Sequence, residues 1–166
     1  MTKLLLSIHV LAAILVVGPI AVAASLFPRY GRQAATAGRD PDARAGGIAA
    51  LLHRICRGYA VVGVAVPVFG IATAVQLGVL TDAWLLTSLA LTALAAALLA
   101  LVILPGQERL LAGADAADSG GDGGGGGGGA PASTAARLSM LTGIFNLLWA
   151  IVVVLMIVRP GSTTGA

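Results

Sequence analysis

Four apolar stretches without any Asp, Glu, Lys or Arg dominate the chain. They cover residues 4–27, 59–80, 83–104 and 138–158, and each is 21 to 24 residues long. A helix rises about 1.5 Å per residue, so each stretch reaches about 30 Å, the thickness of the hydrocarbon core of a bilayer. The pattern predicts an all-α membrane protein, a four-transmembrane-helix bundle that forms a single membrane domain over residues 1–166.

The composition supports this interpretation. The chain is 58% hydrophobic, its mean hydropathy is +0.97 and only 10% of its residues are charged, whereas a soluble domain carries about a quarter. The net charge of +3 reflects membrane orientation rather than nucleic-acid binding, because the basic residues are not combined with aromatic side chains that stack on bases. We therefore expect membrane lipids as partners and no nucleic acid.

The basic residues are distributed unevenly around the apolar stretches. Six arginines lie between residues 28 and 58 and two more between 105 and 137, while the terminal segments carry only Lys3 and Arg159. Positive charges stay in the cytoplasm, so we expect the Arg-rich loops inside and both termini outside a bacterial inner membrane. A signal peptide is the rival interpretation of the first stretch. That stretch is longer than a usual signal peptide core, and the arginines after it would have to be translocated.

A Gly-rich segment separates the third and fourth stretches. It contains seven consecutive glycines at 123–129. Such a segment buries too little apolar surface to offset its ordering entropy. We predict a flexible cytoplasmic loop over residues 113–132.

Rows of small and polar residues predict the inward faces of the helices. Lipid tails are as apolar as Leu, so transmembrane helices associate through close approach and hydrogen bonds. The expected inward rows are Gly63, Pro67, Gly70 and Ala74 in the second helix, Ser88, Thr92, Ala95 and Leu99 in the third, and Ser139, Gly143, Asn146 and Ala150 in the fourth. Pro19 and Pro67 are expected to kink their helices, because proline lacks the N–H of the helical hydrogen bond.

Polar side chains inside a membrane are expensive and mark candidate sites. His9 is the foremost, about 7–8 Å below the outer surface. Its imidazole is suited to bind haem or a transition metal, or to bond a neighbouring helix. At the same level, Met156 is a candidate second haem ligand and Gln76 a candidate partner for the other ring nitrogen. Asn146 lies deeper, where it either lines a polar path or ties helices together.

Two further residues precede the second stretch. His53 lies beside Arg54 and is expected to be solvated or to face lipid headgroups. It is about 20 Å from the level of His9, so the two imidazoles cannot share one ion. Cys56 is the single cysteine and excludes an internal disulfide. We interpret it as an ordinary small residue on a helix face.

No catalytic constellation is present in the sequence. There is no Ser-His-Asp, paired-carboxylate or His-Glu-x-x-His arrangement, and the apolar stretches lack the carboxylate typical of proton- or cation-coupled transporters. This favours a protein that is not itself an enzyme. Three functions stay open: haem or metal binding through His9, a structural or accessory role, and small-solute permeation by an oligomer. The open partners are a second copy and another membrane protein.

Two short segments resemble a known family. They are Ser7-Ile8-His9-Val10-Leu11-Ala12-Ala13-Ile14-Leu15 with Gly18 in the first helix, and Met156-Ile157-Val158-Arg159-Pro160-Gly161 at the end of the fourth. They resemble a family of small bacterial four-helix membrane proteins of unknown function, loosely similar to CopD copper-resistance proteins and HemJ-type protoporphyrinogen oxidases. The resemblance implies a haem-associated histidine at His9. HemJ-type proteins also use an intramembrane lysine, and no lysine follows Lys3 here.

Overall fold

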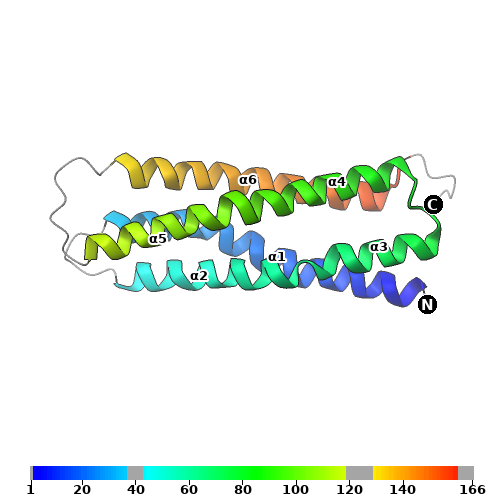
Figure 1. The fold of residues 1–166 in the computed structure, drawn as a ribbon, viewed down its shortest axis with the longest axis horizontal. Helices are drawn as coiled ribbons and strands as arrows, with labels where there is room; N and C mark the ends of the chain where they lie inside the picture. Colours follow the sequence, from blue (N-terminus) through cyan, green and yellow to red (C-terminus); the bar gives the residue numbers. More distant parts are fainter. Residues whose placement is uncertain (1, 37–42, 119–128, 161–166) are drawn as a thin grey trace.

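A computed structural model describes residues 2–36, 43–118 and 129–160 of the chain (Figure 1). These residues form a bundle of long helices and contain no strand. The elements in chain order are α1 (Thr2–Thr36), α2 (Ala43–Val62), α3 (Ala65–Leu77), α4 (Ala83–Leu98), the π-helical turn η1 (Leu99–Ile103), α5 (Leu104–Asp118) and α6 (Gly129–Val158).

These elements form four candidate membrane spans, which confirms the predicted fold class. The spans are Lys3–Ala35, Arg44–Leu77, Ala83–Ala116 and Ala132–Val158. Three of them have 33 or 34 residues, or about 50 Å of helix, and therefore exceed the bilayer core. The surplus lies at the end of the bundle where α1 and α5 end and α2 and α6 begin (Figure 1).

The extra length falls outside the four apolar stretches. It consists of residues 28–36, 43–58, 105–118 and 129–137, which carry most of the arginines. The loop predicted over 113–132 has fewer residues than expected, because 113–118 and 129–132 are helical. Its central part, 119–128, lies outside the described residues.

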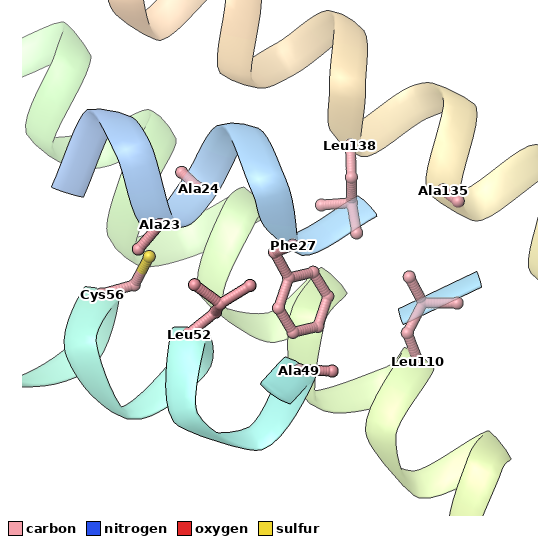
Figure 2. Packing of buried hydrophobic residues seen from close by; sticks show 9 residues of the cluster. All are labelled: Ala23, Ala24, Phe27, Ala49, Leu52, Cys56, Leu110, Ala135 and Leu138. Atoms are coloured by element: carbon pink, nitrogen blue, oxygen red, sulfur yellow. The ribbon is translucent and has the colours of Figure 1, made fainter. Parts of the chain in front are cut away.

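Two hydrophobic clusters follow one another along the bundle. One lies within the apolar stretches and joins all four spans, through Val16, Ile20, Val66, Ala95, Leu99, Ile103 and Phe145. The other lies at the Arg-bearing end, where Phe27 is packed between helices (Figure 2), and consists of Ala23, Ala24, Phe27, Ala49, Leu52, Cys56, Leu110, Ala135 and Leu138. α1 contributes to both clusters, so it is an integral part of the packed bundle.

The second span is interrupted between α2 and α3. Pro67 has no N–H to donate to the carbonyl of Gly63, and its ring crowds that carbonyl. The Val66 N–H donates to the Gly63 carbonyl instead, at 3.1 Å, and the helix resumes at Ala65. This confirms the irregularity predicted at Pro67, whereas α1 stays helical through Pro19.

The third span contains a wider turn before its own proline. In η1 the Leu104 N–H donates to the Leu99 carbonyl, five residues back. Pro105 follows directly and lacks an N–H, so the ordinary ladder cannot continue unchanged. The helix therefore continues past Pro105 as α5 in a shifted register.

The small-residue rows proved correct for two spans and wrong for α6. Ala74, Ser88, Ala95 and Leu99 are buried. On α6, however, Ser139, Gly143 and Ala150 are exposed, and the buried residues are Ala135, Leu138, Thr142, Phe145 and Val152. The buried residues of α6 thus form a different row from the predicted one.

Candidate functional site

His9 lies on α1 against the first turn of α3, next to the interruption in the second span. Its ring is half-buried, and its Nδ1 atom is 2.9 Å from the Val66 carbonyl oxygen. A carbonyl oxygen only accepts hydrogen bonds, so Nδ1 carries the hydrogen. In the neutral ring Nε2 then keeps its lone pair.

Gly70 makes room for this ring. A Cβ atom at this position would lie 2.9 Å from Cε1 and 3.1 Å from Nδ1 of His9, closer than van der Waals contact allows. Gly70 is one helical turn after Val66, so the same stretch of α3 supplies both the carbonyl and the open space. The imidazole therefore lies directly against the α3 backbone, in an orientation fixed by one hydrogen bond.

This arrangement is suited to bind a metal centre. A ligating histidine commonly donates its other ring N–H to a carbonyl or carboxylate, which fixes the tautomer and the ring orientation. Over the described ranges there is no group of three or more His, Cys, Asp and Glu side chains that could hold a metal ion. Haem iron needs only one protein ligand, so the residues at His9 fit haem better than a metal ion held by protein ligands alone.

The other residues expected around His9 are placed differently. The Val66 carbonyl takes the place at Nδ1 that was expected for Gln76, which is exposed on α3. Met156 is half-buried on α6. Among the residues that the structure describes, neither Gln76 nor Met156 forms a hydrogen bond with His9. Sequence reasoning missed the true partner because a backbone carbonyl leaves no signal in the amino-acid pattern.

Asn146 connects α6 with α1. Its Nδ2 donates to the Ser25 hydroxyl at 3.2 Å, and Thr142, one turn earlier, donates to the Ala24 carbonyl at 3.5 Å. The Oδ1 atom of Asn146 and the Nε1 atom of Trp149 are buried without a hydrogen bond in the described part of the chain. Thr142 and Asn146 thus hydrogen-bond α6 to α1.

A second polar cluster joins α2 and α5, and the sequence did not predict it. His53 Nδ1 donates to Gln107 Oε1 at 3.0 Å, and Gln107 Nε2 lies 3.7 Å from Cys56 Sγ. His53 is 8% exposed and Gln107 1%. The expectation that His53 is solvated was therefore wrong: α5 continues beyond the membrane and covers it.

The signal for this cluster is the helical spacing after Pro105. Ile103, Gln107 and Leu110 recur at intervals of four and three residues and are all buried, so they form one inward row. That row is hidden if Pro105 is taken as the end of the helix. Next to it, Glu108 Oε1 lies 3.7 Å from His53 Nε2, but its side chain is 59% exposed, so this contact is weak.

Comparison with known proteins supports the membrane assignment. The model of one family, DUF2269, described as a predicted integral membrane protein, matches residues 3–160. This confirms the expected small membrane family, while the looser similarity to CopD and HemJ-type proteins rests only on the segments quoted above. No curated protein and no solved structure matches the chain.

Proposed function

We propose that this protein, which belongs to the DUF2269 family of predicted integral membrane proteins, binds haem through Nε2 of His9. One observation carries the proposal. The hydrogen bond from Nδ1 to the Val66 carbonyl means that, in the neutral ring, Nε2 is the nitrogen that keeps its lone pair, and it lies within an apolar span. An uncharged nitrogen base in such surroundings is what the haem iron of many proteins accepts as its axial ligand.

The residues around His9 would each have a defined role. His9 supplies the ligand atom, Val66 holds the ring through its carbonyl, and Gly70 leaves the space that the ring occupies. Bound haem would supply an iron centre for electron transfer or for binding a small molecule. Met156 is retained as the candidate second ligand, and a transition metal held with ligands from outside the described residues is the alternative occupant.

The proposal includes the place of the protein in the cell. We infer a bacterial inner membrane protein with both termini outside and the Arg-bearing helix ends in the cytoplasm. Eight of the ten basic residues belong to that end, in accordance with the positive-inside rule. His9, five residues into its apolar stretch, is then close to the outer surface.

The test uses two substitutions that separate ligation from packing. In His9→Asn the amide nitrogen takes the position of Nδ1 and still donates to the Val66 carbonyl, but the Nε2 ligand is lost. In His9→Ala both are lost. The full-length protein, produced with haem supplied and purified in mild detergent, is analysed by absorption spectroscopy, haem extraction and metal analysis.

We expect a haem spectrum in the wild type that is absent from both variants, while His9→Asn keeps the thermal stability of haem-free wild type. A protein that carries neither haem nor metal, and whose spectrum does not respond to added haemin, would overturn the proposal.

The same hydrogen bond favours a second candidate, a non-catalytic structural or accessory membrane protein. Here His9 only ties α1 to α3. This candidate predicts a colourless, metal-free wild type, a destabilised His9→Ala variant and a His9→Asn variant of normal stability. Permeation along Asn146 and Gln76 stays a prediction: Asn146 bonds Ser25 of α1, and Gln76 is exposed on α3.

A further inference from the structure

A shallow groove, open to the outside, lies on the exposed face of α2, and all of its lining residues belong to this helix. Its volume is about 350 Å³, its surface is mostly apolar, and it is lined by Arg54, Ile55, Gly58, Tyr59 and Val62. Gly58 lies in the middle of the groove. A Cβ atom there would meet nothing within 4 Å, so the absence of a side chain leaves this part of the groove open.

The groove lies across the expected membrane boundary. The second apolar stretch begins at Tyr59, while Arg54 and Arg57 precede it. The distance from Arg54 to Val62 along the helix is about 12 Å. One end of the groove is therefore at the level of lipid headgroups and the other at the level of the first acyl carbons, with an aromatic residue of the type enriched at this boundary between them.

The charge at the headgroup end is available for a ligand. Arg54 and Arg57 are exposed, and within the described ranges neither forms an ion pair with a carboxylate. A guanidinium binds phosphate through two parallel hydrogen bonds, and basic residues close to the membrane surface attract anionic lipids. At the other end, Val62 is exposed and apolar.

We propose that this groove binds one anionic phospholipid, with the lipid phosphate at Arg54 and the start of an acyl chain over Gly58 and along Val62. A glycerophospholipid has the required order of groups, an anionic phosphate followed by hydrocarbon. The site is independent of the proposed haem ligation at His9, so either proposal can fail without the other.

The experiment measures lipid binding to the purified full-length protein by native mass spectrometry, with phosphatidylglycerol or phosphatidylcholine added to the detergent. Gly58→Leu fills the groove without changing the charge. Its control is Gly47→Leu, an exposed glycine on α2 outside the groove where an added Cβ also meets nothing within 4 Å. Arg54→Gln removes the phosphate ligand, and its control is Arg44→Gln on the same helix.

We expect the first phosphatidylglycerol to bind at least about tenfold more weakly to Gly58→Leu and Arg54→Gln, while both controls bind it like the wild type. Glycerol phosphate, which has no acyl chain, should not compete. Equal binding by all variants, no preference over phosphatidylcholine, or full competition by glycerol phosphate would each overturn the proposal, the last by identifying a simple anion site.

Discussion

One hydrogen bond at His9 decides which ring nitrogen is free to bind a ligand. Because the Val66 carbonyl accepts from Nδ1, the ring presents Nε2. The sequence singled out His9 because a polar residue interrupts an apolar stretch, but it could not reveal the carbonyl partner. For His53 the local context was misleading. The neighbouring arginine favoured a solvent-exposed imidazole, whereas α5 buries the ring.

Gly70 gives a first prediction at this scale. In Gly70→Ala the new Cβ would come within 2.9 Å of His9 Cε1, so the ring or α3 has to move and the bond to Val66 weakens. We expect a loss of about 1–3 kcal/mol, measured by thermal unfolding in detergent. Gly143→Ala is the matched control, since a Cβ there meets nothing within 4 Å. Equal stability of the two variants would show that the ring does not lie on Gly70.

At the scale of the helices, the apolar stretches predicted the spans well, and the rows of small residues predicted the contact faces only in part. The length and apolarity of each stretch are sufficient to identify a membrane helix, because a helix of about 20 apolar residues spans the bilayer core and satisfies its backbone hydrogen bonds within the stretch. The prediction of the inward face of α6 was wrong because small residues favour an interface without specifying which partner they meet. On α6 they are exposed, while Phe145 and its neighbours pack inward.

The helix ends beyond the apolar stretches do not follow from apolarity, since they carry arginines and the Pro105-Gly106 pair. Their packing depends on the buried cluster of Phe27, Cys56 and Leu110 with its neighbours (Figure 2), and on the polar contact between His53 and Gln107. α5 therefore continues the third span as a packed helix instead of ending at Pro105.

The contact between α2 and α5 gives the second prediction. Gln107→Leu leaves the buried Nδ1–H of His53 without an acceptor, which should cost about 1–3 kcal/mol of unfolding free energy. The neighbouring Glu108→Gln changes a contact of 3.7 Å made by a mostly exposed side chain, and should cost less than about 1 kcal/mol. Thermal unfolding of both variants in detergent checks this order, and the reverse order would contradict the structure.

At the scale of the whole molecule, the start of α1 and the end of α6 lie at one end of the bundle and the Arg-bearing helix ends at the other (Figure 1). The sequence predicts this arrangement through its charge asymmetry, and the structure adds that the Arg-bearing ends are helical extensions with a core of their own. α5 ends at Asp118 and α6 begins at Gly129.

Cysteine labelling tests this orientation. In a Cys56→Ala background, single cysteines are introduced as Asp122→Cys in the Gly-rich segment and Ser162→Cys near the C-terminus. We expect a membrane-impermeant maleimide to label Ser162→Cys in intact spheroplasts and Asp122→Cys only after the membrane is disrupted. The opposite pattern would invert the topology and place His9 near the cytoplasm.

The nitrogen atoms of the imidazole rings provide the most direct test of ligand binding at His9. The chain has two histidines, so ¹⁵N-histidine labelling gives two sets of ring signals in the purified protein, and His53→Asn assigns them. We predict that neutral His9 carries its hydrogen on Nδ1, and that added haemin shifts the ring signals of His9, Nε2 most strongly, while those of His53 stay unchanged. A hydrogen on Nε2 with no haemin response would contradict a ligand role for His9.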